Sequence, residues 1–182
     1  LTLGTSGGTQ TFNGGLTTTS GTVILNGTIQ SSDDNMIFGA VTLGSTTVID
    51  TNATSTNTGD IAIDSITGGS NALTLSTGDN VNQADIDIVG TVTGITTLTL
   101  ANIGDHIDFS GSVDATTLSV DNTVNRVTFD GNTTITNAVS FANDGALTFS
   151  TGSAGGNRTY NGGLTTTSVG GTVTLNGTIA TS

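Results

Sequence analysis

Four residues whose side chains can take part in acid–base or ionic chemistry stand at equivalent points of the sequence. Each directly precedes the first residue of an alternating apolar segment: Asp60, Asp85, His106 and Arg126. If those segments stack, the four side chains form one outward column, in which His and Arg relieve the repulsion between carboxylates by about 0.2–1 kcal/mol per pair. The functional alternative makes His106 a general base beside Asp85 or Asp108, although an exposed His among carboxylates is ordinarily just solvated.

Three Asp residues of the same region are weak candidates for a calcium site: Asp85, Asp87 and Asp108. Calcium takes six or more oxygen ligands at about 2.3–2.6 Å. Neither the EF-hand spacing nor the Gly-Gly-x-Gly-x-Asp repeat is present. The sequence therefore predicts no catalytic residue and no cofactor, with calcium as the one cation left open.

Composition excludes several classes of function. The chain has no Cys, no Lys and no Trp, and all 14 acidic residues are Asp, so that the formal net charge is −12. Two Arg residues cannot neutralise a phosphate backbone, so nucleic acid is not an expected partner. No apolar run is long enough to insert into a membrane. A polysaccharide-cleaving enzyme is an alternative, but the chain lacks the Lys and the aromatic platforms that sugar clefts use, and we expect no enzyme.

A long repeat organises the chain. Residues 11–20 return as residues 159–168, and residues 21–29 return as residues 171–179 after a two-residue insertion at Val169-Gly170. More broadly, residues 1–31 are similar to residues 147–182. We interpret residues 1–182 as a single segment that holds one long repeat of roughly 150 residues plus the start of the next.

A shorter period of about 20 to 25 residues predicts the fold. Four segments of the form Φ-x-Φ-x-Gly-x-Φ/Thr align, beginning at Ile86, Ile107, Val127 and Val173, with the segment at Val23 as the earlier copy of the last. A second apolar pair lies between them in each period: Leu73-x-Leu75, Leu98-x-Leu100, Leu118-x-Val120 and Val139-x-Phe141. Period-two alternation is typical of short strands, and Gly, Asn and Asp supply the corners. The pattern predicts an all-β, single-stranded parallel β-helix (β-solenoid), right-handed by the usual rule for parallel crossovers, and it favours this over a hairpin-based sandwich.

The segments Val23 to Ile29 and Val173 to Ile179, together with Thr-Phe-Asn-Gly-Gly-Leu-Thr-Thr-Thr at residues 11–19, resemble the repeats of filamentous-haemagglutinin and autotransporter-type bacterial surface proteins. The resemblance covers most of the chain, and much of it is compositional. It implies a right-handed parallel β-helix, secretion to the cell surface, and a role as stalk, adhesin passenger or surface filament.

On this basis we expect a structural or adhesive extracellular segment whose partners are neighbouring copies of itself, end to end, and a host surface or polysaccharide. A self-assembling filament subunit and a polysaccharide-binding or polysaccharide-cleaving β-helix are the alternatives. Ice binding through regular Thr columns is a further one, but the Thr-rich stretches do not recur at one fixed interval. Five Asn-x-Ser/Thr sequons are candidates for glycosylation, at Asn26, Asn52, Asn132, Asn157 and Asn176.

Overall fold

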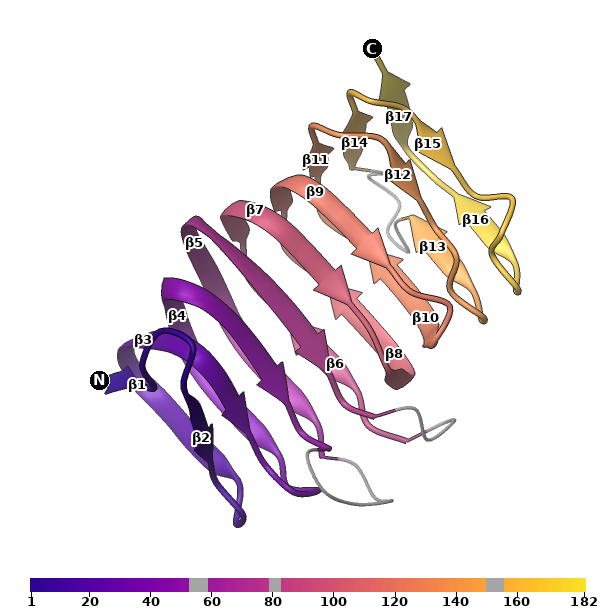
Figure 1. Ribbon diagram of the computed structural model, residues 1–182. Coiled ribbons are helices and arrows are strands. Elements are labelled where there is room, and N and C mark those ends of the chain that lie inside the picture. The colour runs from indigo at the N-terminus through magenta and orange to yellow at the C-terminus, as the bar shows by residue number, and fades with distance from the viewer. Residues whose placement is uncertain (53–58, 79–82, 150–155) are drawn as a thin grey trace.

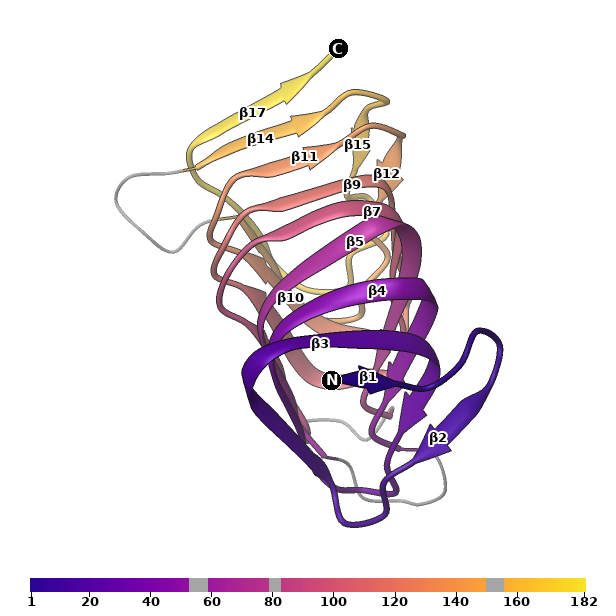
Figure 2. The same ribbon diagram turned by 90° about the vertical axis from the view of Figure 1, so that its left-hand side faces the viewer.

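The computed structural model describes residues 1–52, 59–78, 83–149 and 156–182. Every described element is a β-strand, and the chain winds as a solenoid of about eight coils (Figures 1 and 2). All ladders between the named strands are parallel. The β-solenoid expected from the two periods is therefore confirmed.

The strands differ in length because some bend round a corner and continue. The bounds are β1 (Thr2–Leu3), β2 (Thr9–Thr11), β3 (Leu16–Gln30), β4 (Met36–Asp50), β5 (Ile61–Ser76), β6 (Ile86–Ile88), β7 (Val92–Leu100), β8 (Ile103–Phe109), β9 (Val113–Val120), β10 (Val124–Phe129), β11 (Thr133–Ile135), β12 (Val139–Ser140), β13 (Leu147–Phe149), β14 (Asn157–Tyr160), β15 (Leu164–Thr165), β16 (Val173–Leu175) and β17 (Thr178–Thr181).

Three faces run along the solenoid, and each is a ladder of residues paired from coil to coil. The first face stacks Leu16, Met36, Ile61, Ile86, Ile107, Val127, Leu147 and Val173. The second stacks Val23, Val41, Ile66, Val92, Val113, Thr133, Arg158 and Ile179. The third stacks Ile29, Ile49, Leu75, Leu100, Val120 and Phe141. The strands β1 and β2 extend the second and third faces at the N-terminal end.

Alternate residues of each strand point inward and build one continuous core. Nearly every apolar residue of the three ladders is buried, and the burial of each contributes about 1.5–3 kcal/mol. The C-terminal half of the core is aromatic: the rings of Phe109 and Phe129 stack with centroids 5.0 Å apart, Phe141 and Phe149 pack against Phe129, and Tyr160 packs against Phe141 and Phe149. Because each coil covers its neighbour, the apolar core depends on the stacking of coils.

The glycine of the repeated motif lies at the corner between the first and second faces. At Gly111 a Cβ would collide with the backbone oxygen of Gly90, and at Gly131 it would collide with the backbone oxygen of Gly111. The stacked corners therefore approach each other more closely than a side chain allows, which explains the Gly in Φ-x-Φ-x-Gly.

The two copies of the long repeat occupy different faces. The aligned segments at Ile86, Ile107, Val127 and Val173 all begin on the first face, as expected. The earlier copy, at Val23, begins on the second face, where it pairs with Val41. The alignment with the other segments therefore placed the Val23 segment on the wrong face of the coil. The same shift places Leu16 on the first face and its counterpart Leu164 on the third face, beside Val139.

The length of the corners accounts for the two-residue insertion. In the first copy the chain turns from the first to the second face between Thr18 and Val23, over five positions. In the second copy it turns from the third to the first face between Thr166 and Val173, over seven positions. The corresponding corner takes seven positions in two earlier coils, from Leu100 to Ile107 and from Val120 to Val127, and six in the coil directly before, from Phe141 to Leu147. Val169-Gly170 therefore adapts the repeated sequence to a wider corner.

Candidate functional site

The expected column of ionisable residues lies on the outer side of the first face. The backbone N–H of Asp85 donates to Asp60 Oδ1 at 3.0 Å, and His106 Nδ1 lies 3.0 Å from Asp85 Oδ1. His106 and Arg126 are paired in register on β8 and β10. The column predicted from spacing alone is therefore present, one residue per coil.

The calcium candidates lie on the same outer surface. Asp87 and Asp108 are directly paired between β6 and β8, and Asp85 precedes Asp87 by two residues on the same side of the strand. The described residues contain one group of three potential metal ligands whose ligand atoms all lie within 4.8 Å of one another, and it consists of Asp85, Asp105 and His106. Asp87 and Asp108 lie beside this group and are not part of it.

Asp105 is the residue that the sequence pattern did not single out. Strict alternation before Ile107 would turn Asp105 toward the core. The ladder between β8 and β10 contains a register shift, because Ile103 to His106 on β8 opposes the shorter stretch Val124 to Arg126 on β10. The extra residue forms a β-bulge, which redirects Asp105 outward to an ion pair with Arg126.

Electrostatics divide the carboxylates of this surface into two kinds. Partial burial raises the pKa of Asp108, and the charges of Asp130 and Asp87 raise it further. The pKa of Asp85 is also raised, by partial burial, although the neighbouring His106 acts in the opposite direction. Burial alone would raise the pKa of Asp105 too, but its hydrogen bond to Arg126 and the charge of that guanidinium lower it overall.

A depression adjoins the column, lined by the ionisable residues His106, Asp108, Arg126 and Asp130 with two threonines and Ala146. Its chemistry is limited. The contact with Asp85 holds the Nδ1 side of the imidazole, which leaves Nε2 for a proton or a cation, while Asp105 is already engaged by Arg126. None of the exposed large apolar residues among the described ones is aromatic, so this surface offers no ring on which a sugar could stack.

Arg158 is a second residue that composition and spacing did not place. It lies on the second face between Thr133 and Ile179, and it is fully buried. Its guanidinium donates to the carbonyl oxygens of Phe129 at 2.8 Å and Gly156 at 2.7 Å, with longer bonds of 3.2 Å to three more carbonyls, those of Asp130, Gly131 and Asn176. Burial lowers the pKa of the Arg158 guanidinium. The residue therefore ties together the corner backbones of three successive coils.

The repeat itself held a signal for this role. Arg158 replaces Gln10 of the first copy, and alternation turns both positions inward. The side-chain oxygen of Gln10 accepts a hydrogen bond from the backbone N–H of Gly4 at 2.8 Å. Both copies thus place a long polar side chain inward to satisfy corner backbone groups.

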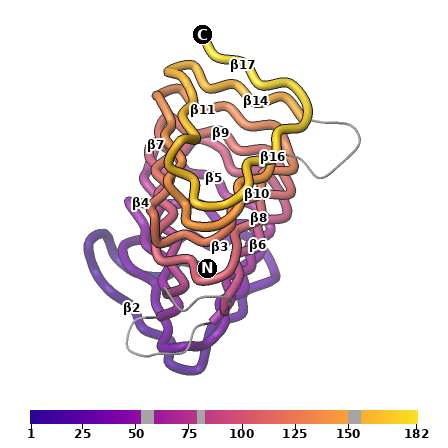
Figure 3. Tube along the Cα trace, turned by 90° about the vertical axis from the view of Figure 1, so that its right-hand side faces the viewer, coloured from indigo at the N-terminus to yellow at the C-terminus, as the bar shows by residue number. Residues whose placement is uncertain are grey.

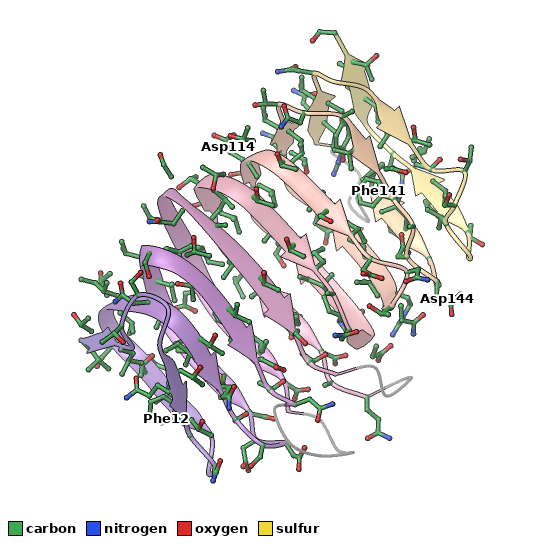
Figure 4. The ribbon with its side chains drawn as sticks, in the orientation of Figure 1. Phe12, Asp114, Phe141 and Asp144 are labelled. Atoms are coloured by element: carbon green, nitrogen blue, oxygen red, sulfur yellow. The ribbon has the colours of Figure 1, made fainter. Side chains whose placement is uncertain are left out.

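A hydroxyl column runs along the outer side of the third face, contrary to the expectation drawn from unequal spacing. Because the corners absorb the differences in coil length, one hydroxyl residue from each of five successive coils falls in line: Thr74, Thr99, Ser119, Ser140 and Thr165. Toward the N-terminal end the column is broken once, at Val48, and resumes with Thr28 and Thr9. In the described part of the chain, the equivalent columns of the other two faces hold hydroxyls over at most three successive coils. They are interrupted, for example, by Asp87 on the first face and Asp114 on the second. Figure 4 shows Asp114 on the outside of the solenoid.

The five sequons differ in accessibility. Asn132, Asn157 and Asn176 are exposed, whereas Asn26 and Asn52 are half-buried. The Asn26 amide donates to the backbone oxygen of Leu3 at 3.4 Å, and Asn132 Oδ1 accepts from the N–H of Asn157 at 2.9 Å. The Thr of the Asn52 sequon lies outside the described residues.

In comparisons with known proteins, no family model, curated protein or solved structure matches the chain. Across the described ranges, no helix has the length and apolarity needed to cross a bilayer.

Proposed function

We propose that this chain is a structural and adhesive extracellular segment, a stiff rod that spaces and displays surfaces. The observation that carries the proposal is the unbroken stacking of inward side chains on three faces over about eight coils. At about 4.8 Å per strand spacing, eight coils make a rod of roughly 40 Å. A solid core with in-register ladders on every side resists bending, and stiffness is the property that a spacer requires.

Rigidity can be measured between two residues of one column. Thr17 and Thr174 are both outward on the first face and are separated by seven ladder steps, or about 34 Å between backbones. Spin labels on cysteines at these positions should give one narrow distance distribution. A broad or bimodal distribution would contradict a stiff rod, and circular dichroism of the labelled protein controls for unfolding.

The hydroxyl column of the third face favours an adhesive role for that surface. Threonine is common on exposed strands through β-propensity alone, but that preference acts on all three faces, and only the third aligns hydroxyls over five successive described coils. A row of hydroxyls at the strand spacing can hydrogen-bond to a neutral polysaccharide. The acidic first face is less suited to a polyanionic surface because the charges repel.

Pull-down with cellulose and chitin particles tests the adhesive role. The double variant Thr74→Glu, Thr99→Glu on the third face should lose retention, whereas the matched variant Thr67→Glu, Thr93→Glu on the second face should retain it. Val48→Thr closes the single break in the column and should strengthen retention. Equal behaviour of the two double variants, or no retention of the parent chain, would remove the third face as an adhesive surface.

A further inference from the structure

Three side chains from two neighbouring coils converge on one point of the outer surface. Asp85 directly precedes β6, and Asp105 and His106 belong to β8, which pairs with β6 on the first face (Figure 3). His106 Nδ1 lies 3.0 Å from Asp85 Oδ1 and 3.7 Å from Asp105 Oδ2. One ligand atom from each side chain lies within 4.8 Å of the other two. A nitrogen and two carboxylate oxygens therefore meet at a separation that suits a single metal ion.

Two of these atoms are buried and make no hydrogen bond. His106 Nδ1 and Asp85 Oδ1 are both shielded from solvent, and neither has a hydrogen-bond partner among the described residues, although they lie 3.0 Å apart. The nitrogen and the oxygen therefore face each other without an N–H directed along the line between them. Buried polar atoms are ordinarily paired. A cation between the two atoms accepts a lone pair from each and satisfies both.

The backbone and Arg126 hold this group in place. The β-bulge in β8 turns Asp105 outward, and the Asp105 backbone N–H donates at 3.3 Å to the carbonyl oxygen of Ala84, the residue before Asp85. The two carboxylate oxygens of Asp105 are divided, because Oδ1 contacts Arg126 and Oδ2 lies toward His106. Metal-binding carboxylates are commonly oriented by such a second partner. The ligands are therefore positioned by contacts that do not depend on the cation.

The ligand types and their spacing select the kind of cation. Bonds of about 2.0–2.2 Å from nitrogen and oxygen to a tetrahedral zinc ion place neighbouring ligand atoms about 3.3–3.5 Å apart. The two distances of 3.0 and 3.7 Å lie on either side of that range, so small side-chain movements complete the geometry. An imidazole nitrogen suits zinc and similar transition metals, whereas calcium takes six or more oxygen ligands. The group therefore fits a zinc-type ion better than calcium.

The surrounding charges also favour a divalent cation. Partial burial raises the pKa of Asp85, and the charges of Asp105, Asp60 and Asp87 raise it further, against the opposite effect of His106. Arg126 offsets one of these four carboxylates through its ion pair with Asp105. A divalent cation reduces the repulsion among the rest.

We propose that Asp85 Oδ1, Asp105 Oδ2 and His106 Nδ1 bind a divalent transition-metal ion of the zinc type, which bridges the coils of β6 and β8. Water takes the fourth position of the tetrahedron, because the described residues supply three ligands. The apolar core and the backbone ladders hold the fold without the cation, so metal binding is not a condition of folding. The site is also independent of the proposed rod and of the hydroxyl column on the third face.

Calorimetric titration with zinc chloride, after EDTA treatment and dialysis, measures the site. The natural chain should bind one zinc ion, and calcium should bind about tenfold more weakly or less. His106→Ala and Asp105→Asn each remove a ligand and should weaken zinc binding by about tenfold or more. The matched variants Asp87→Asn and Asp108→Asn remove a carboxylate beside the group and should weaken it by no more than about threefold, because solvent and salt screen these charges. Circular dichroism shows whether each variant is folded.

Nitrogen NMR of the imidazole identifies the ligand atom without any substitution, because His106 is the only His of the chain. Zinc should shift the Nδ1 resonance and leave Nε2 protonated. Binding through Nε2, or the absence of a one-to-one titration with zinc, would overturn the site. Calcium binding as tight as zinc binding, or equal losses in the ligand variants and the matched variants, would show only a general attraction of cations to the acidic surface and would also overturn it.

Discussion

The two arginines of the chain allow a matched test of what holds the rod together. Arg158 is fully buried and donates to five backbone carbonyls, whereas Arg126 has half of its side chain exposed and pairs with Asp105 on the surface. Replacement by Met keeps the length and apolar stem of each side chain and removes its charge and its donors.

The expected cost at Arg158 follows from its two short hydrogen bonds, to the carbonyls of Phe129 and Gly156. A hydrogen bond to a charged group contributes about 1.5–3 kcal/mol, so these two account for about 3–6 kcal/mol. Removing the guanidinium also removes its burial cost of several kcal/mol, which offsets part of the loss. We therefore expect Arg158→Met to lower the free energy of unfolding by about 2–4 kcal/mol, and Arg126→Met by no more than about 1 kcal/mol.

Urea unfolding followed by circular dichroism measures both variants, with the slope m compared to confirm that the exposed area is unchanged. For a chain of this size, about 2–4 kcal/mol corresponds to a fall in Tm of roughly 4–16 °C. Arg158→Lys should recover only part of the loss, because an ammonium cannot reach carbonyls of three coils as the planar guanidinium does. If Arg158→Met and Arg126→Met unfold at the same urea concentration, the buried arginine does not tie the coils together.

Four further predictions are tested by unfolding, three with urea and the last with heat. Phe129→Ala should lower the free energy of unfolding by about 3–5 kcal/mol, because the Phe129 ring packs among other aromatic rings. Thr128→Ala, outward on the same strand, should change it by no more than about 0.5 kcal/mol. Equal losses for the two variants would contradict the assignment of Phe129 to the core. Tyr160→Phe should raise the free energy of unfolding by about 1 kcal/mol, because the Tyr160 hydroxyl is buried without a hydrogen-bond partner among the described residues. Burial also raises the pKa of this hydroxyl well above its ordinary value, and the first repeat copy carries Phe12 at the equivalent position. A lower free energy of unfolding would show that the hydroxyl makes a hydrogen bond after all. The raised pKa of Asp108 means that the native form binds the Asp108 proton more tightly than the unfolded chain, so the free energy of unfolding falls as pH rises above the ordinary value of 3.8. Asp108→Asn should therefore raise the urea midpoint at pH 7 and leave it nearly unchanged at pH 3. The reverse pattern would refute burial and the neighbouring carboxylates as the cause of the raised pKa. EDTA should leave Tm unchanged to within about 1 °C, because apolar stacking and backbone ladders hold the fold; a larger fall, restored by calcium, would show a bound cation at the acidic surface.

Periodicity in the sequence was enough to predict the solenoid. Apolar residues recur in pairs at Leu73 and Leu75, Leu98 and Leu100, and the structure stacks these pairs on one face. The column through Asp85 and His106 followed from the same reasoning, because a residue just before an inward position must point outward in every coil. Spacing therefore predicted this one column of the outer surface as well as the core.

The part that spacing could not predict depends on corners and bulges. A corner of five or of seven residues looks the same in composition, yet it decides whether a repeated strand lies on the first, second or third face, as Val23 and Val173 show. One extra residue in β8 turned Asp105 outward into contact with His106 and Arg126. Such local shifts change which side chains meet without changing the pattern of apolar residues.

Alternation and period are properties of the order of residues, so they were enough to predict that this chain winds into parallel coils around an apolar core. The folded structure was needed to see which hydroxyls of the third face fall into one column and why a charged Arg158 lies inside. Both depend on the register between coils, and that register is set by how the corner backbones pack against one another in space.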